Sequence, residues 1–340
     1  MILEGKRVLV TGGTGSLGQV VVRRMLTGEL GRPARITVYS RDEAKQNDMR
    51  LAYHHRREAT DDIIYQTSRE VLGFRIGDVR DYPALAHAVR EHDVVVHAAA
   101  LKQVPSCEYF PMEAVRTNIE GAANLVRAIG EGGAGVELVV GISTDKACKP
   151  VNVMGMSKAI MERVLIEANM ECPSTRFVCV RYGNVVASRG SVVPLFLEQI
   201  ARGGPVTITT AEMTRFLLTL DRAVDTVFAA MRDAKRGELF VPRVPAAKMT
   251  DVAAALIGDR PIGVVVTGVR PGEKIHEIMV SEEEVNRTTE RGGYYVILPI
   301  LPELRAAGDF TPVLRGEYSS AEVTLDVPAL RELLRAETGG

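Results

Sequence analysis

A glycine-rich turn near the N-terminus limits what this 340-residue chain can fold into more than any other feature. Gly12, Gly15 and Gly18 follow the apolar residues 8–10 and open an apolar-periodic helix that we predict over residues 17–26. Glycine is needed where such a turn bends sharply and where its backbone approaches a pyrophosphate, and the helix then offers its first N–H groups to the phosphates. We therefore predict a dinucleotide site rather than a plain turn, with contacts from Gly12, Thr14, Gly15, Ser16, Leu17 and Gly18.

Short apolar segments alternate with helical patterns through the first half of the chain. After the strand at residues 8–10, we predict further strands over residues 36–39, 74–76, 94–96, 138–140 and 177–180, and a helix over residues 112–129. Near-continuous apolar strands between helices are typical of a parallel sheet that is covered on both faces. The sequence therefore predicts an α/β fold, a Rossmann-like doubly wound parallel sheet.

The end of the second predicted strand indicates which dinucleotide binds. An acidic residue there would hold a ribose 2′-hydroxyl, but this strand ends with Ser40 and Arg41, a hydroxyl and a planar cation that suit a 2′-phosphate. Asp42 follows directly and leaves NAD as the alternative. We predict NADP, with Asp78 and Val79 after the third strand flanking the adenine.

The sequence pattern changes after about residue 184, where frequent proline and glycine residues divide the chain into short segments. We predict an NADP-binding Rossmann domain over residues 1–185 and a smaller substrate-binding region over residues 186–340, interleaved with the first rather than independent. The His-Arg run at residues 54–57 is better explained by a solvated helix face than by a metal or phosphate site, because adjacent helical residues point in different directions.

Composition excludes several classes of protein. A formal net charge of −1 argues against a nucleic-acid partner, and four cysteines without a Cys-x-x-Cys pair argue against a zinc site or a disulfide scaffold. The sequence has no signal-peptide profile and no apolar run that approaches the ~18–20 residues of a membrane span. We expect a cytoplasmic protein that has no metal site and no membrane partner.

A second motif bears on the chemistry. Met154 and Lys158 have the spacing of a Tyr-x-x-x-Lys pair, but a thioether cannot give or take a proton. Asp145 and Lys146 are then the nearest candidates for acid–base chemistry, because they follow a predicted strand and α/β sheets place ligands at the carboxyl ends of strands. The alternatives are that Met154 only fills the core and that Asp145 and Lys146 form a salt bridge in a loop.

With these motifs the chain resembles an extended short-chain dehydrogenase/reductase. More narrowly, it is similar to the bacterial UDP-N-acetylglucosamine 4,6-dehydratases of polysaccharide and glycan biosynthesis, in part of which methionine also replaces the usual tyrosine. The resemblance runs from residue 6 to about residue 280. It rests on residues 40–43, 97–105, 117–121, 143–147, 152–158, 181–185, 213–216 and 270–274.

The resemblance implies a self-contained redox cycle on UDP-N-acetylglucosamine. Hydride transfer to NADP oxidises C4, water is eliminated across C5 and C6, and the hydride returns to C6, which gives a UDP-4-keto-6-deoxy-N-acetylhexosamine. We expect retention at C5 in preference to inversion. Elimination needs an acid near the C6 oxygen and a base near C5. Asp145 as the acid requires a raised pKa, and Lys146 as the base requires a depressed pKa.

The resemblance also implies roles for further residues. Lys158 would hydrogen-bond the nicotinamide ribose, and Thr144 would bond the C4 hydroxyl, whose proton leaves through Thr144, Lys158 or water. Met154 is included among the predicted catalytic residues because it stands at the tyrosine position of the motif. Other implied cofactor contacts are Ala98, Ala99, Ala100 and Lys102, and the implied substrate contacts are Lys102, Asn184, Arg215, Arg270 and Glu273. A homo-oligomer is implied as well.

Two other functions remain open at this point. A UDP-sugar 4-epimerase would share the fold, the cofactor and the nucleotide site, but epimerisation does not need the dedicated elimination acid that Asp145 suggests. A non-catalytic NADP-binding regulatory protein is suggested by Met154 alone.

Overall fold

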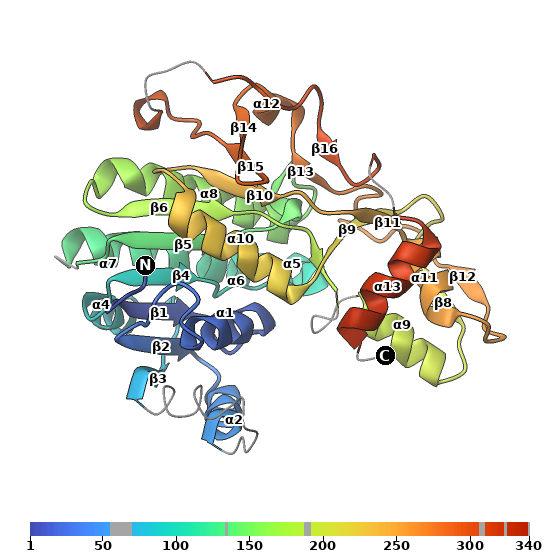
Figure 1. The fold of residues 1–340 in the computed structure, drawn as a ribbon, viewed down its shortest axis with the longest axis horizontal. Coiled ribbons are helices and arrows are strands. Elements are labelled where there is room, and N and C mark those ends of the chain that lie inside the picture. The colour runs from blue at the N-terminus through green and yellow to red at the C-terminus, as the bar shows by residue number, and fades with distance from the viewer. Residues whose placement is uncertain (55–69, 133–134, 187–191, 306–309, 323–324, 339–340) are drawn as a thin grey trace.

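A nine-stranded sheet forms the body of the molecule (Figure 1). The computed structural model describes residues 1–54, 70–132, 135–186, 192–305, 310–322 and 325–338, so residues 55–57 of the His-Arg run lie outside the described residues. In spatial order the strands are β14 (Thr288–Arg291), β15 (Tyr294–Ile297), β10 (Leu239–Pro242), β6 (Arg176–Val180), β5 (Leu138–Ile142), β4 (Val94–His97), β1 (Arg7–Thr11), β2 (Arg35–Ser40) and β3 (Leu72–Ile76).

The sheet is parallel from β3 to β10, and β15 and β14 then add antiparallel strands at one edge. The order β3-β2-β1-β4-β5-β6 is that of a doubly wound dinucleotide-binding sheet, which confirms the predicted fold class. The sheet reverses its strand order between β1 and β4, and ligands of such sheets bind at the carboxyl ends of the strands around this point.

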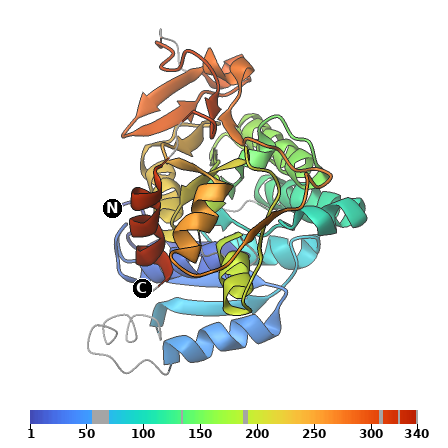
Figure 2. The same ribbon diagram turned by 90° about the vertical axis from the view of Figure 1, so that its right-hand side faces the viewer.

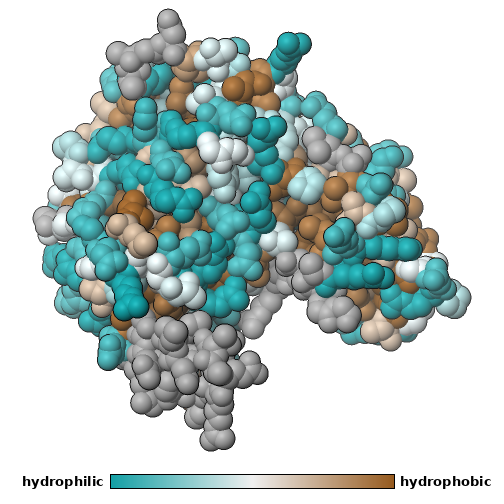
Figure 3. Space-filling view, in the orientation of Figure 1, coloured by the Kyte–Doolittle hydropathy of each residue, from teal (hydrophilic) through white to brown (hydrophobic). Residues whose placement is uncertain are grey.

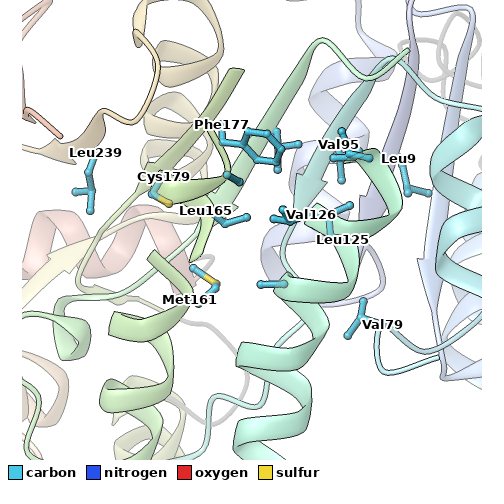
Figure 4. Close-up of a cluster of buried hydrophobic side chains, with 14 of the residues drawn as sticks. Leu9, Val79, Val95, Leu125, Val126, Met161, Leu165, Phe177, Cys179 and Leu239 are labelled. Atoms are coloured by element: carbon cyan, nitrogen blue, oxygen red, sulfur yellow. The ribbon is translucent and has the colours of Figure 1, made fainter. Parts of the chain in front are cut away.

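Both faces of the central strands are apolar, because alternate residues point to opposite faces. Leu9 and Val95 pack with helices α4 and α7 and with α8, whereas Val8 and Val94 pack with α1 and α10 on the other face. Figure 4 shows the first of these two cores, in which side chains of the helices meet those of the strands. The helices of the body are α1 (Ser16–Leu26), α2 (Glu43–His54), α4 (Tyr82–Arg90), α5 (Val104–Tyr109), α6 (Pro111–Ala114), α7 (Gly121–Glu131), α8 (Val153–Glu171) and α10 (Leu220–Asp233).

The helix that we predicted over residues 112–129 is not a continuous α-helix. A π-helical segment, η1 (Val115–Glu120), separates α6 from α7. The side chain of Asn118, inside this segment, accepts a hydrogen bond from Leu101 N at 2.8 Å and donates to Leu101 O at 3.0 Å and to Ser157 Oγ at 2.9 Å. The π-helical turn therefore ties the chain after β4 to α8, an effect of tertiary contacts that the apolar period does not reveal.

A smaller lobe with its own core is built from segments after residue 191 (Figure 1). Figure 2 shows its helices α9, α11 and α13 side by side. The three-stranded sheet β11-β9-β7 connects this lobe to the body. The elements concerned are β7 (Asn184–Val185), α9 (Val192–Ala201), β8 (Val206–Ile208), β9 (Thr214–Leu218), β11 (Ala246–Lys248), α11 (Met249–Ile257), β12 (Val264–Val266) and α13 (Val327–Thr338).

The chain returns to the body after the lobe has begun, since α10, β10, β14 and β15 all follow residue 185. The remaining elements are η2 (Asp145–Ala147), β13 (Ile278–Val280), α12 (Glu282–Val285), η3 (Pro302–Leu304) and β16 (Tyr318–Ser319), with β13 paired to β16. The functional division at residue 185 stays a prediction. Among the described helices, none combines the length and the apolar character that crossing a membrane requires.

Candidate active site

A pocket of about 560 Å³ lies between the body and the smaller lobe. Lys146, Asn184, Arg215 and Glu277 line it together with residues of α9 and β8. Figure 3 shows apolar residues gathered where the body meets the lobe. The volume lies within the range of ~300–1,000 Å³ that small-molecule sites occupy, so this pocket is the candidate substrate site.

The glycine turn packs directly against the end of β4. Gly12 has a φ of +68°, and a Cβ atom added to it would lie 2.7 Å from the backbone N of Ala99. A Cβ atom on Gly18 would lie 2.5 Å from Gly13 Cα. Helix α1 begins at Ser16 with Gly15 as its N-cap, so no side chain of the cap occupies the first amides. These backbone features fit the phosphates of a dinucleotide.

The other predicted residues of the turn lie in the same place. Thr14 is buried, and its carbonyl accepts a hydrogen bond from Gln19 Nε2 at 2.9 Å. Leu17 packs against the cores on the sheet. Across the turn, Thr11 binds the chain after β4 through hydrogen bonds from Ala98 N at 3.1 Å and Ala99 N at 3.3 Å, and Ala100 is partly buried next to them.

The end of β2 presents one exposed cation. The Arg41 side chain is 56% exposed, and its Nη1 lies 3.8 Å from Asp78 Oδ2. Ser40 is buried, and its Oγ accepts a hydrogen bond from Gln46 Nε2 at 3.1 Å. Asp42 Oδ1 accepts a hydrogen bond from Lys45 N at 3.0 Å, and the Asp42 carboxylate pairs with the Lys45 ammonium. Arg41 is therefore better placed than Asp42 to meet a ligand.

The predicted adenine contacts lie after β3. Asp78 accepts hydrogen bonds from the backbone N of Arg80 at 3.0 Å and from Arg80 Nη2 at 2.7 Å. Val79 is buried, and its side chain lies against Gly121, where a Cβ atom would be 2.7 Å from Val79 Cγ2. Asp78 thus joins Arg41 and Arg80 at the carboxyl edge of the sheet, while the Val79 side chain packs against Gly121, and the adenine contacts stay a prediction.

Asp145 lies just beyond the carboxyl end of β5, in the short helix η2. Its carboxyl is fully buried, and Oδ1 accepts hydrogen bonds from Thr144 Oγ1 at 2.8 Å and from Lys146 Nζ at 3.1 Å. Burial raises the pKa of Asp145, although Lys146 opposes this effect. The raised pKa agrees in direction with what an elimination acid requires.

Lys146 differs from our expectation. Its Nζ lies 3.1 Å from Asp145 Oδ1, 3.1 Å from Glu277 Oε1 and 3.2 Å from Asn184 Oδ1. Burial opposes the charge of Lys146, but the two carboxylates outweigh burial and raise the pKa of Lys146. A base at this position requires a depressed pKa, and the raised pKa of Lys146 opposes that requirement, because the sequence did not reveal the second carboxylate.

Glu277 is the residue of this site that sequence reasoning missed. It is 1% exposed and precedes β13, far from Lys146 in the chain. Arg215 Nε lies 3.8 Å from Glu277 Oε1, and Lys274 Nζ lies 4.0 Å from Glu277 Oε2. Burial opposes ionisation of Glu277, but the three cations around it outweigh burial and lower its pKa. Its only sequence signal is a place just after the segment 270–274.

Lys158 and Met154 lie on α8 and are both buried. Lys158 Nζ donates a hydrogen bond to Met161 Sδ at 2.9 Å. Burial lowers the pKa of Lys158 to about 8. Burial and the charge of Lys158 lower the pKa of His97, at the end of β4, to about 3. Met154 packs in a small apolar cluster with Cys107. Within the described ranges, the residues that line the 560 Å³ pocket do not include Thr144, Asp145, Met154 or Lys158.

The predicted substrate contacts do line that pocket. Arg215 is buried and donates hydrogen bonds to the carbonyls of Thr214 at 2.7 Å, Ile275 at 3.0 Å and Lys274 at 2.9 Å. The Arg270 side chain is 62% exposed, with its Nε 3.6 Å from Glu273 Oε1. Burial lowers the pKa of Lys102. The structure thus brings Lys102, Lys146, Asn184, Arg215, Arg270 and Glu273 to one pocket.

The chain has relatives of known family along nearly its whole length. The family model described as polysaccharide biosynthesis protein matches residues 8–299. A Rickettsia typhi protein named UDP-glucose 4-epimerase is 44% identical, with 97% of this chain and 95% of that protein covered. A Campylobacter jejuni protein named UDP-N-acetylglucosamine 4,6-dehydratase (inverting) is 40% identical, with 93% and 90% covered.

A solved structure also matches the complete architecture. Pen from Bacillus thuringiensis has a TM-score of 0.87 and 31% identity, with 99% of this chain and 100% of that chain covered. The family match, the dehydratase relative and the doubly wound sheet agree with the resemblance that the motifs carry. The chain belongs to the polysaccharide biosynthesis protein family and is an extended short-chain dehydrogenase/reductase that resembles UDP-N-acetylglucosamine 4,6-dehydratase.

Proposed function

We propose that this protein is an NADP-dependent dehydratase of UDP-N-acetylglucosamine that forms a UDP-4-keto-6-deoxy-N-acetylhexosamine. The observation that carries the proposal is the fully buried Asp145 carboxyl beside Lys146, at the carboxyl end of β5 and next to a pocket that Lys146 lines. A buried carboxyl with a raised pKa is suited to give a proton to the leaving C6 hydroxyl. Epimerisation at C4 does not use such an acid.

The glycine turn and Arg41 support the cofactor assignment. The first amides of α1 would bind the pyrophosphate, and the exposed Arg41 guanidinium would pair with a 2′-phosphate, while Asp42 is engaged by Lys45. A nicotinamide cofactor bound here would supply the acceptor for the C4 hydride and its return to C6. NAD is the alternative if Asp42 turns to a ribose hydroxyl.

The charged residues of the pocket support a nucleoside diphosphate as part of the substrate. Arg270 is exposed enough to bind a diphosphate, and Lys102 lines the same pocket. Arg215 is engaged by three carbonyls, which suggests that it also organises the pocket wall. The names of the Rickettsia and Campylobacter relatives both specify UDP-sugars, which supports the same class of substrate.

Thr144 and Lys158 are the proposed partners of the C4 hydroxyl. Thr144 Oγ1 donates to Asp145 Oδ1 at 2.8 Å, which orients this hydroxyl, and the C4 proton would leave through Thr144, Lys158 or water. Lys158, whose pKa burial lowers to about 8, would hold the nicotinamide ribose. Our assignment of Lys146 as the C5 base requires a neutral amine, which its two carboxylate neighbours oppose.

Incubation with UDP-N-acetylglucosamine tests the proposal. We expect mass spectrometry to show a product that has lost one water and NMR to show a 4-keto sugar, and the NMR couplings at C5 separate the predicted retention from the inversion named for the Campylobacter relative. The Rickettsia relative supports a second candidate, a UDP-glucose 4-epimerase. Interconversion of UDP-glucose and UDP-galactose without loss of water would support it, and the absence of any turnover would support a regulatory protein.

A further inference from the structure

We propose that Glu277 is a positioning residue for Lys146, whose amine its carboxylate holds at the wall of the pocket by hydrogen bonding and by charge. The inference rests on the proposed dehydration, in which Lys146 takes the C5 proton, and it adds to that step a residue that no sequence motif indicated. Glu277 acts through Lys146, and the proposal gives it no contact with the reacting carbons.

The Lys146 side chain needs a fixed partner to act at one place. Its nitrogen ends a flexible four-carbon stem, yet proton transfer requires that nitrogen within hydrogen-bond reach of the reacting group. Among the described residues, three side-chain oxygens lie near Nζ: Asp145 Oδ1 at 3.1 Å, Glu277 Oε1 at 3.1 Å and Asn184 Oδ1 at 3.2 Å. Asp145 is the neighbour of Lys146 in the chain, so Glu277 is the charged partner that a distant segment supplies.

Glu277 is itself held firmly, as an anchor must be. Its backbone N donates to Ser320 Oγ at 2.9 Å, and its carbonyl accepts from Ser320 N at 2.8 Å. Ser320 Oγ lies 2.7 Å from Thr214 Oγ1, so this pair of segments is tied to β9 as well. Glu277 is only 1% exposed, although it lines the 560 Å³ pocket beside Lys146. The carboxylate is therefore the fixed member of the pair, and the lysine is the flexible one.

The segment 270–277 joins this anchor to the predicted substrate contacts at its other end, and both ends line the same pocket. The carbonyl of Gly272 accepts a hydrogen bond at 2.7 Å from Nδ2 of Asn152, which caps the start of α8. Lys274 Nζ donates to the carbonyl of Cys148, just after η2, at 2.5 Å. The segment is thus bonded to the chain on the far side of Lys146, and the anchor and the lysine are held in register.

The charge of Glu277 also acts on Lys146. The charged groups that face this amine are Asp145 in η2, Glu277, Arg215 on β9 and Lys274. Burial opposes the charge of Lys146, but the two carboxylates outweigh burial and raise the pKa of Lys146, against a smaller opposing effect of Arg215. Lys146 takes a proton only as a neutral amine. Removing the charge of Glu277 should therefore make Lys146 a base at lower pH.

Glu277→Gln tests the charge, because glutamine keeps an oxygen that can accept from Lys146. Glu277 raises the pKa of Asp145 as well as that of Lys146, so we expect both limbs of the pH profile of water loss to move to lower pH. The limb that Lys146 governs should move by about 1–3 units, while KM for UDP-N-acetylglucosamine stays within about threefold. Unshifted limbs in the folded, cofactor-loaded variant would overturn the proposal. A residue with a merely structural role would lower the rate without moving the limbs.

Acetylation of Lys146 gives a readout that does not depend on turnover. Acetic anhydride reacts with neutral amines, and the Lys146 side chain is 21% exposed and lines the pocket. Peptide mass spectrometry across a pH series, without substrate, should show Lys146 labelled at lower pH in Glu277→Gln than in the wild type. Glu282→Gln, in which the altered side chain is exposed at the start of α12, is the matched control and should label like the wild type. Equal labelling in all three proteins would contradict the proposal.

Glu277→Asp tests the position and decides the matter if the glutamine variant does not fold. Aspartate keeps the charge but withdraws the oxygen from Lys146, so kcat should fall by more than about tenfold while the limbs stay within about half a pH unit. A kcat like that of the wild type would overturn the positioning role.

The two readouts also separate this proposal from the proposed function. A wild-type protein that loses no water, but whose Lys146 labelling shifts in Glu277→Gln, would contradict the dehydration and leave the anchor in place. A wild-type protein that loses water, with labelling and limbs that do not shift in the variant, would contradict the anchor and leave the dehydration in place.

Discussion

The glycine turn and the ionic cluster differ in how far apart their residues lie in the chain. The glycines of the turn lie within residues 12–18 and act through backbone shape, with close packing on Ala99 after β4. The cluster joins Asp145 and Lys146 of η2 to Glu277 before β13 and acts through burial and charge. A site of the first kind is encoded by adjacent residues. A site of the second kind exists only when the fold brings distant charges together, and each charge changes the others.

This comparison predicts that the two regions can be damaged separately. Asp145→Asn should reduce water loss by ~10²–10⁴-fold, because it removes the acid, while dinucleotide binding stays within about twofold. Product analysis by mass spectrometry and a fluorescence titration of the cofactor measure the two effects. A variant that kept near-full dehydratase activity would exclude Asp145 as the acid, and one that lost the cofactor would show that the regions are coupled.

The reverse experiment alters the turn alone. Gly12→Ala should weaken dinucleotide binding by at least about tenfold and destabilise the fold by a few kcal/mol, because its Cβ would lie 2.7 Å from Ala99 N. Gly5→Ala is the matched control, since Gly5 has almost the same φ, +67° against +68°, and no atom within 4 Å of its added Cβ. Thermal unfolding and cofactor titration are measured for both variants. Gly5→Ala reports the cost of a positive φ alone, and Gly12→Ala adds the close contact with Ala99. Equal losses of stability and of cofactor affinity in the two variants would contradict the packing argument.

A smaller effect is expected at the edge of the dinucleotide site. Arg41→Ala should weaken NADP binding by about 1–3 kcal/mol and NAD binding by much less, because it removes a charge-assisted hydrogen bond to the 2′-phosphate. Arg50→Ala, on the exposed side of α2, controls for the loss of one positive charge nearby. Identifying the nucleotide that the denatured wild type releases completes the test, and recovery of NAD alone would contradict the NADP assignment.

The smallest effect is expected at Met154. Met154→Leu should cost less than about 1.5 kcal/mol of stability and keep substantial activity, because the residue packs in an apolar cluster and has no titratable group. Met156→Leu, on the exposed side of the same helix, is the control. Lys158→Ala should lose much more activity. If Met154→Leu were as inactive as Lys158→Ala while folded and loaded with cofactor, the sulfur would have a specific role.

Much of the body of the fold was predictable because its signals are local. The apolar strands and the glycine turn gave the doubly wound sheet, and the six predicted strands correspond to β1 to β6. The helix over residues 112–129 was predicted as continuous, since an apolar period cannot show that Asn118 bonds Leu101 and Ser157. The strands β14 and β15 were not predicted, because their place at the edge of the sheet depends on pairing with β10.

The sequence by itself determined the dinucleotide turn, the family and the presence of an acidic and a basic residue after the fifth strand. Only the tertiary structure decided the direction in which the pKa values of these two residues are shifted. Asp145 has a raised pKa because the fold buries it, and the pKa of Lys146 is raised because Asp145 and Glu277 each have an oxygen 3.1 Å from its Nζ. The physical reason is that turn geometry depends on neighbours along the chain, whereas a pKa depends on burial and on charges that approach through space.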